Sequence, residues 1–288
     1  MSQDRLDASL DIDRRSTLEI VRIIQEQDAL VGPAVAAEAQ QIAHAVDEIA
    51  NRLAHGGRMF YVGAGTSGRI AMLDAAELPP TFGIDSSLVR VLIADGERAF
   101  FAAAEGAEDD EEAAIAAVEK EVVADDAVIG IAASGTTPYT VAAIRKANML
   151  GALTVGITSQ PGSPLAQDSD IAIVPETGPE VIMGSTRMKS GTAQKLVLNT
   201  ISTAVMIRLG RVYSNLMIDM PATNEKLRSR AVRMVELAAE VARPVAAQAL
   251  RDANGNVRLA AVMAKKRISP DEARRLLDAR PLREVLEA

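Results

Sequence analysis

The fold is decided by residues 58–69, which read RMFYVGAGTSGR. The first half, RMFYV, is a short apolar run of the kind that forms a buried strand. The second half, GAGTSGR, is rich in glycine and hydroxyl groups and leads into the helical stretch SGRIAMLDAAEL. A strand that passes through a glycine-rich loop into a helix is the repeating unit of α/β proteins.

Four further apolar runs have the same design. Each is short, β-branched and bounded by turn residues, and they read DSSLVRVLIADG (85–96), ADDAVIGIAASG (124–135), GALTVGITSQPG (151–162) and DIAIVPETG (170–178). Helical stretches such as DEEAAIAAVEKEVV and TPYTVAAIRKANML separate several of them. Alternating strands and helices favour a mostly parallel sheet that helices cover on both faces. The sequence therefore predicts an α/β fold, a three-layer α/β/α sandwich.

The pattern divides the chain into three parts. Residues 1–50 are expected to form an N-terminal helical arm, with a capping-box spacing at Ser16 and Glu19 and a break at Val31-Gly32-Pro33. Residues 51–218 hold the strands and include a long apolar helix over residues 191–210. From residue 219 to residue 288 the strands stop, and charged helical segments predict a small C-terminal helical domain.

Composition disfavours several classes of function. The chain has 288 residues and no Cys, so disulfides and thiolate nucleophiles are excluded. Its two histidines, His44 and His55, are expected on a helix surface and at a helix end, and no metal site is expected. The net charge of −8 argues against nucleic-acid binding. Because no apolar run is long enough for a membrane span and the start is polar, a cytoplasmic protein is predicted.

The first loop, residues 63–69, has the chemistry of an anion site. Helix N-termini present unpaired N–H groups and the positive end of a dipole, and the Thr66 and Ser67 hydroxyls add donors. The same letters fit G-x-G-x-x-G, so a dinucleotide site with Asp95 as ribose ligand is a second interpretation. A purely structural turn is a third. The late arrival of the next strand, after Pro79-Pro80, disfavours the dinucleotide.

The second loop, AASGTTP at residues 132–138, decides among these interpretations. It also follows a strand and precedes a helix. Three hydroxyls lie at this helix start, those of Ser134, Thr136 and Thr137, whereas a structural cap needs only one. Gly135 lets the backbone approach a ligand closely. Two such loops on one sheet predict a single phosphorylated ligand, with a sugar phosphate favoured, across the carboxyl ends of the strands.

Longer segments carry a resemblance to a known family. The two loops resemble the sugar isomerase (SIS) fold, whose members bind phosphosugars. Five segments occur in the order and at the spacing typical of the N-acetylmuramic acid 6-phosphate etherases, namely STLEIVRII, LDAAELPPTFG, AAEGAEDDEE, GSTRMKSGTAQKLVLN and NLMIDMPATNEKL. The resemblance implies a lyase that cleaves the lactyl ether of N-acetylmuramic acid 6-phosphate. The products would be N-acetylglucosamine 6-phosphate and D-lactate.

The resemblance has further implications for partners and cofactors. It implies a homodimer whose active site lies near the subunit interface, and a reaction that needs no cofactor and no metal. It implies a small-molecule phosphosugar as the ligand, while charge and hydropathy predict neither nucleic acid nor membrane as a partner. The biological role would be the recycling of cell-wall amino sugars in the bacterial cytoplasm.

The resemblance assigns the catalytic carboxyls. Glu77 matches the general acid of the family, and Glu108 matches the second catalytic glutamate, with Glu105 as the less favoured choice. From position alone, Glu77 is an ordinary carboxylate at the end of a helix before Pro79-Pro80. Glu108 belongs to an acidic run at a helix start, where the dipole favours negative charge. Only the resemblance distinguishes the functional from the structural interpretation.

The resemblance also assigns ligand contacts. Ser134 and Thr137, with nearby backbone amides, would hold the 6-phosphate, and Thr66 and Ser67 would hold the other side of the sugar phosphate. The whole phosphate-binding set is Thr66, Ser67, Ser134, Gly135, Thr136 and Thr137. Further candidate contacts are Glu180, Arg187 and Lys189, although the two basic residues could equally pair with the acidic surface.

Two departures from the family and three alternative functions remain. Thr136 stands where the family has an arginine, which puts one ligand contact in doubt, and Ala76 stands where a serine is common.

A phosphosugar-sensing module without catalysis is one alternative, but the presence of Glu77 and Glu108 favours an enzyme. A sugar-phosphate isomerase would interconvert aldose and ketose without releasing lactate. A DNA-binding regulator would need a basic helix-turn-helix domain, which the acidic N-terminus does not offer.

Overall fold

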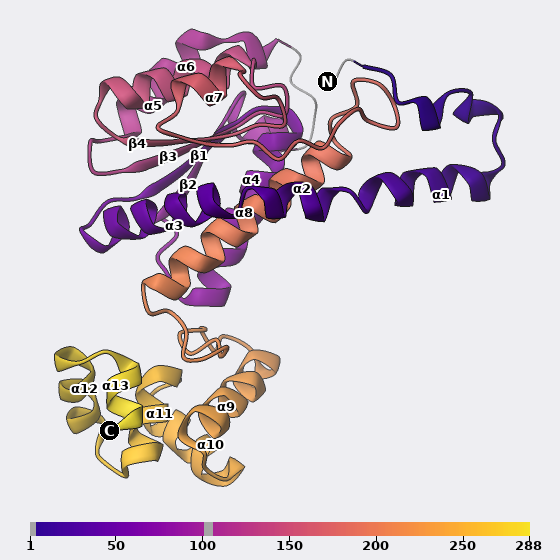
Figure 1. Ribbon diagram of the computed structural model, residues 1–288. Coiled ribbons are helices and arrows are strands. Elements are labelled where there is room, and N and C mark those ends of the chain that lie inside the picture. The colour runs from indigo at the N-terminus through magenta and orange to yellow at the C-terminus, as the bar shows by residue number, and fades with distance from the viewer. Residues whose placement is uncertain (1–3, 101–105) are drawn as a thin grey trace. The chain divides into compact units, whose positions relative to one another are not determined.

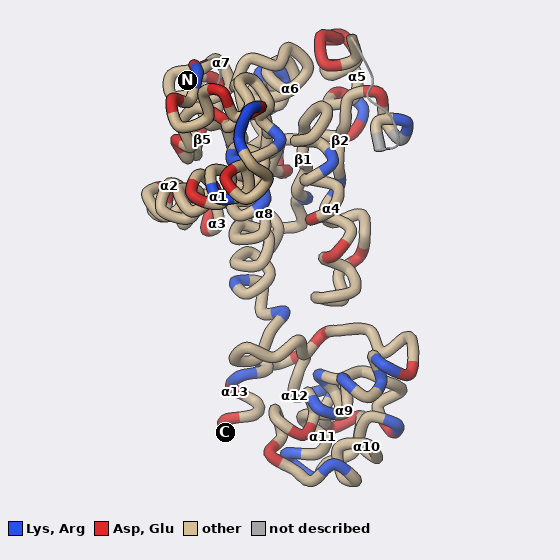
Figure 2. The backbone as a smooth tube through the Cα atoms, turned by 90° about the vertical axis from the view of Figure 1, so that its right-hand side faces the viewer, with Lys and Arg blue, Asp and Glu red and all other residues tan. Residues whose placement is uncertain are grey.

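The computed structural model describes residues 4–100 and 106–288, which form two compact units (Figure 1). The first comprises Met1–Ala76 and Ser87–Val205, and the second comprises Glu77–Ser86 and Met206–Ala288. By sequence, the first unit carries 15 Lys and Arg against 27 Asp and Glu, and the second carries 16 against 12 (Figure 2). Because the net field of the first unit repels anions, any anion there must be held by local donors.

A five-stranded parallel sheet forms the centre of the first unit. Its strands are β1 (Met59–Gly63), β2 (Val89–Ile93), β3 (Ala127–Ile131), β4 (Leu153–Ile157) and β5 (Ile171–Ile173). Their order across the sheet is β2-β1-β3-β4-β5, and every neighbouring pair is parallel. All residues of β1, β3 and β4 are buried, as expected for strands covered on both faces. All five predicted strands are confirmed.

Helices cover both faces of this sheet, as Figure 1 shows. On one face lie α5 (Glu111–Glu121), α6 (Pro138–Met149) and α7 (Pro164–Asp168). On the other face lie α3 (Ala39–Ala54), α4 (Gly65–Phe82) and α8 (Lys189–Arg208). The prediction of a three-layer α/β/α sandwich is therefore confirmed.

The N-terminal segment is helical, with one correction. Two short 3-10 helices (Asp7–Ser9 and Ile12–Arg14) precede α1 (Thr17–Asp28) and α2 (Val31–Ala37). The capping box is confirmed, since the Ser16 hydroxyl accepts from the N–H of Glu19 and the Glu19 carboxylate accepts from the N–H of Ser16. The predicted break at Val31-Gly32-Pro33 is wrong. The chain turns at Ala29-Leu30, and a proline in the first turn of α2 loses no needed N–H.

Helix α4 continues through two prolines. The expectation that Glu77 ends this helix is wrong, because Pro79 and Pro80 lie inside α4, which runs to Phe82. The prolines cannot donate to the preceding turn. The Thr81 hydroxyl instead donates to the carbonyl of Glu77 (2.7 Å), and the N–H of Gly83 donates to the carbonyl of Pro79 (2.9 Å). These two bonds stabilise the end of α4, but they do not replace the two N–H groups that the prolines lack.

Helices α4 and α8 run side by side and are joined by a buried carboxylate. Asp74 of α4 is 5% exposed and accepts from the hydroxyl of Tyr61 in β1 (2.7 Å). It also accepts from the Ser202 hydroxyl (3.0 Å) and the Asn199 amide, both in α8. Burial, followed by the nearby Asp74 charge, raises the pKa of Tyr61 well above its ordinary value. This network holds the register of α8 against α4.

The second unit has a helical core of its own. Its helices are α9 (Glu225–Ala239), α10 (Arg243–Asp252), α11 (Val257–Lys266), α12 (Pro270–Ala279) and α13 (Leu282–Glu287). They bury small and aliphatic residues such as Ala231, Val235 and Val262. Helix α12 starts with a capping box, in which Ser269 and Glu272 are bonded reciprocally. Residues 206–288 contain no strand, consistent with the expected helical pattern.

Candidate functional site

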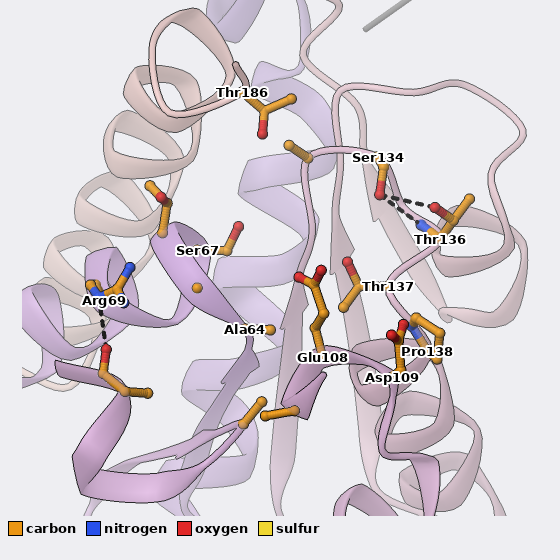
Figure 3. A pocket seen from close by; sticks show the side chains of 16 residues that line it. Ala64, Ser67, Arg69, Glu108, Asp109, Ser134, Thr136, Thr137, Pro138 and Thr186 are labelled. Carbon is orange, nitrogen blue, oxygen red and sulfur yellow. Dashed lines mark hydrogen bonds between the residues drawn. The ribbon is translucent and has the colours of Figure 1, made fainter. Parts of the chain in front are cut away.

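The candidate site lies where β1 and β3 end. These two strands are neighbours, and the chain leaves them in opposite directions, toward β2 and toward β4. Ligands of open α/β sheets bind at such a switch point. A hollow of about 560 Å³ opens there (Figure 3). Its lining residues are Ala64, Gly65, Thr66, Ser67, Arg69, Ala94, Ala99, Ala107, Glu108, Asp109, Ala133, Ser134, Thr136, Thr137, Pro138 and Thr186.

The first loop turns directly from β1 into α4. At Gly68 an added Cβ would lie 2.6 Å from the Ile93 side chain and 3.1 Å from the carbonyl of Gly63, so only glycine allows this close approach. Thr66 is exposed and Ser67 is partly buried, and both line the hollow. Asp95, the proposed ribose ligand of a dinucleotide, instead pairs with Arg98 at 2.6 Å. The loop thus offers hydroxyls and helix N–H groups to an anion.

The second loop places its hydroxyls at the start of α6. Gly135 has a φ of +66°, and an added Cβ would lie 2.0 Å from the Ser163 hydroxyl oxygen, so the turn requires glycine. Ser134 accepts from the N–H and the hydroxyl of Thr136 (3.2 and 3.0 Å). Thr137 precedes the first residue of α6, and its side chain makes no capping bond. The Thr137 hydroxyl therefore remains available to a ligand.

Glu108 joins the two loops in the hollow. It lies in a 3-10 helix (Ala107–Asp109) that follows Gly106, and it is exposed. Figure 3 shows its carboxylate pointing into the hollow. The next residues have a structural role, since Asp110 accepts from the N–H of Ala113 and caps α5. Glu105, the less favoured choice, lies outside the described residues.

Glu180 and Lys189 hold structure rather than line the hollow. Glu180 is 1% exposed, and its two carboxylate oxygens accept from the N–H groups of Lys189 and Ser190 (both 3.0 Å) at the start of α8. The Lys189 ammonium donates to the Gln27 side chain (2.9 Å), and burial lowers the pKa of Lys189. Arg187 is exposed, and Thr186 is the residue of this segment that reaches the hollow.

Glu77 lies elsewhere. It is exposed, belongs to the second unit, and is not among the residues that line the hollow. The structure thus brings Glu108 together with both loops, and Glu77 is not among the side chains that it places around the hollow.

Sequence reasoning missed Arg69, Thr186 and Gln194. Arg69 follows the first loop directly, lines the hollow, and donates from Nε to the carbonyl of Ala99 (2.8 Å) (Figure 3). It is the one cationic side chain among the described residues that line the hollow. Its place beside the anion-binding loop was the available signal. Gln194 lies behind Ser67 and had no local signal, because their approach depends on how α8 packs on α4.

The two histidines take the structural positions expected of them. His44 is an exposed residue of α3, and His55 follows that helix with its Nδ1 2.7 Å from the carbonyl oxygen of Asn51. Within residues 4–100 and 106–288, no group of three or more His, Asp or Glu side chains is placed to hold a metal ion. None of the helices in these ranges has the length and apolar character that a membrane crossing requires.

Comparisons with known proteins extend these observations. Residues 41–148 match the family described as glucokinase regulatory protein N-terminal SIS domain, and residues 103–204 match the SIS domain. A putative phosphosugar isomerase of Bacteroides fragilis has a similar structure, with a TM-score of 0.51 and 22% identity over 69% of this chain and 98% of the other. A phosphoheptose isomerase of Francisella tularensis has a TM-score of 0.51 and 17% identity, over 66% of this chain and 98% of the other. These likenesses support the fold.

Whole-length relatives carry more information. The chain is 57% identical over 262 residues to the N-acetylmuramic acid 6-phosphate etherase of Symbiobacterium thermophilum, covering 91% of this chain and 87% of the relative. It is 48% identical over 278 residues to the enzyme of the same name from Clostridium beijerinckii, covering 96% of this chain and 91% of the relative. The similarity thus includes both compact units rather than the sheet alone.

Proposed function

The chain belongs to the N-acetylmuramic acid 6-phosphate etherase family, and we propose that it is the lyase that cleaves the D-lactyl ether of N-acetylmuramic acid 6-phosphate. The products are N-acetylglucosamine 6-phosphate and D-lactate. The observation that carries the proposal is the convergence of two hydroxyl-bearing loops and the Glu108 carboxylate on one hollow. Such a hollow can hold a sugar phosphate and present a carboxylate to its carbon atoms.

The second loop is the better phosphate site. The first N–H groups of α6 have no partner within the helix, and they carry the positive end of the helix dipole. Thr137 and Ser134 add hydroxyls beside them. Thr66 and Ser67 face them from the other loop. Since the first unit carries an excess of carboxylates, these neutral local donors supply the attraction that its net charge does not.

Glu108 serves as the base of the proposed reaction. In the ring-opened sugar the C2 proton is α to the aldehyde, and the lactyl ether at C3 is β to it. Removal of the C2 proton forms the C2–C3 double bond, while the C3–O bond breaks and the departing lactate oxygen takes a proton from an acid. Water then adds its oxygen to C3 and a proton to C2. One carboxylate and one carboxylic acid suffice for this sequence.

Glu77 is the acid, and a second copy of the chain supplies it. The proposal of a shared site starts from the lining of the hollow, which includes Glu108 but not Glu77. A symmetric dimer resolves this, because each copy can lend its Glu77 to the other. Helix α1 offers a surface for such a partner. None of its residues is buried, and Leu18 and Val21 are 58% and 43% exposed.

Mixing two inactive variants tests the shared site. Glu77→Ala and Glu108→Ala proteins, unfolded and refolded together, should regain about a quarter of the wild-type rate of lactate release. Half of the dimers are then mixed, and each mixed dimer has one intact site. Each variant refolded alone is the control. A mixture as silent as its components would show that one chain supplies both carboxyls.

Arg69 distinguishes substrate from product in this proposal. The substrate carries a lactyl carboxylate that the product N-acetylglucosamine 6-phosphate lacks, and arginine is a strong carboxylate partner. Arg69→Met in a Glu108→Gln background is expected to weaken substrate binding about tenfold or more, and product binding by less than about twofold. Calorimetry with both ligands measures this, with Arg69→Lys as the charge-retaining control. An equal loss of binding affinity for substrate and product would contradict a contact between Arg69 and the lactyl carboxylate.

Release of D-lactate by the purified protein tests the function itself. The wild type is expected to convert N-acetylmuramic acid 6-phosphate to lactate and N-acetylglucosamine 6-phosphate. Binding of the phosphosugar without lactate would support a sensing module instead, and aldose–ketose interconversion would support an isomerase. The proposed role is the recycling of cell-wall amino sugars in the bacterial cytoplasm by a homodimer.

A further inference from the structure

A buried amide stands directly behind the first loop. Gln194 of α8 is 2% exposed, and its Oε1 lies 3.0 Å from the hydroxyl oxygen of Ser67, which lines the hollow. In this arrangement Ser67 donates its hydroxyl hydrogen to Gln194. Since a serine hydroxyl has only one hydrogen, Ser67 then faces the hollow as an acceptor. An acceptor beside a phosphate is unfavourable, because the phosphate oxygens also accept.

The other half of the same amide has no partner. The Nε2 of Gln194 is buried and makes no hydrogen bond within the described part of the chain. An unpaired buried N–H group costs about 1–3 kcal/mol. Rotating the amide by 180° exchanges Nε2 and Oε1, so that Nε2 donates to Ser67. The unpaired group is then a carbonyl oxygen, which proteins tolerate better than an unpaired N–H.

We propose that Gln194 is a positioning residue that sets the direction of the Ser67 hydroxyl. With Nε2 toward Ser67, the serine accepts from Gln194 and donates its hydrogen into the hollow, where an anionic oxygen of the ligand receives it. Ligand binding selects this orientation of the amide, because the other orientation leaves Ser67 without a donor. The inference rests on the proposed function only for the identity of the ligand.

The surroundings hold Gln194 in place for this role. Helix α8 is fixed at its start by Glu180, which accepts from two backbone N–H groups. It is fixed further along by Asp74, which accepts from Ser202 and Asn199. Gln194 lies between these two anchors, so its amide can rotate about its own axis while its backbone stays beside the first loop. The packing thus leaves the amide orientation as the adjustable element.

Two substitutions at one position separate this role from packing. Gln194→Glu, with its carboxyl ionised, can only accept from Ser67, so it turns the Ser67 hydrogen away from the ligand. Gln194→Met keeps the length of the side chain and leaves the Ser67 hydroxyl free to donate. We expect the Kd for N-acetylglucosamine 6-phosphate to rise about tenfold or more in Gln194→Glu and about threefold or less in Gln194→Met. A packing role alone would predict similar losses for both.

The Ser67→Ala background removes the remaining ambiguity. If Gln194→Glu acts through Ser67, it adds less than about twofold to the Kd of Ser67→Ala, because coupled residues are not additive. If the new charge simply repels the ligand, the full loss persists in that background and the inference is overturned. Gln167→Glu, at an exposed position of α7, is the control for the change in net charge, and thermal unfolding of each variant checks folding.

Binding and turnover together separate failure of the inference from failure of the proposed function. A wild type that binds neither inorganic phosphate nor N-acetylglucosamine 6-phosphate, and releases no lactate, contradicts both. A wild type that binds the sugar phosphate and releases lactate, with Gln194→Glu no weaker than Gln194→Met, contradicts the inference alone. The inference is supported if Gln194→Glu binds the sugar phosphate more weakly than Gln194→Met does, and if this loss of affinity disappears in the Ser67→Ala background.

Discussion

Glu108→Gln is expected to lower kcat for D-lactate release by about 10²–10⁴-fold, the usual contribution of a positioned acid or base. The amide occupies the same space as the carboxylate but cannot take the C2 proton. Glu108 lines the hollow together with Thr66 and Thr137, so it lies within reach of a ligand held by either loop. Because the substitution removes no phosphate contact, we expect the KM to change much less than kcat.

A neighbouring carboxylate provides the matched control for this prediction. Asp109→Asn removes the same charge from the same hollow and should leave kcat within about threefold of the wild type, because only a base in line with C2 contributes. Steady-state release of lactate, with an exchange assay for the C2 proton in deuterated water, measures both variants. An inactive Asp109→Asn together with an active Glu108→Gln would show that Asp109, and not Glu108, is the base. A silent Glu105→Gln with an active Glu108→Gln would move it to Glu105.

Asp126→Ala is expected to lower the free energy of unfolding by about 3 kcal/mol, at the lower end of the cost of breaking a buried ion pair. The Asp126 side chain is 1% exposed, and it pairs with the Arg58 guanidinium at 2.8 Å. It also accepts from the N–H groups of Arg58 (2.8 Å) and Val123 (2.9 Å). These bonds join the starts of β1 and β3, whose other ends carry the two ligand loops.

Urea denaturation, monitored by circular dichroism, measures this loss of stability. Asp125→Ala is the control, because its carboxylate is adjacent in sequence and exposed, and it should change the unfolding free energy by less than about 0.5 kcal/mol. The partly exposed Arg58 can take up water when Asp126 is removed, which limits the expected cost. Equal stability of the two variants would contradict a structural role for the Asp126 ion pair.

The strands and both loops that line the hollow could be predicted from the sequence because their signals are local. A short β-branched run between turn residues has few alternatives to a buried strand, and a glycine-rich turn before a helix start exposes N–H groups wherever it occurs. The adjacency of the two loops followed from one rule of parallel sheets. For the same reason the hydroxyls of Thr66, Ser67, Ser134, Thr136 and Thr137 were all found.

The expected end of α4 at Glu77 failed because a local pattern competes with packing there. Pro79-Pro80 is a strong local signal for a helix end, yet α4 continues to Phe82, and the Thr81 hydroxyl and the Gly83 N–H donate to carbonyls of its last turns. Glu180 and Lys189 are charged residues in a loop of family-like sequence, and they were reasonable ligand candidates. Their burial at the start of α8 depends on contacts with Ser190 and Gln27, which no local pattern reveals.

The sequence by itself determined the α/β class, the two glycine- and hydroxyl-rich loops and the family, because each depends on short motifs and on their order along the chain. Only the tertiary structure decided which charged groups share the hollow. It placed Glu108 and Arg69 beside the loops and Gln194 behind Ser67, and it did not place Glu77 in the lining. The physical reason is that these positions depend on how helices pack against each other, because packing brings together residues that are distant in sequence. A shift of one helical turn, about 5.4 Å, would bring a different side chain to the hollow.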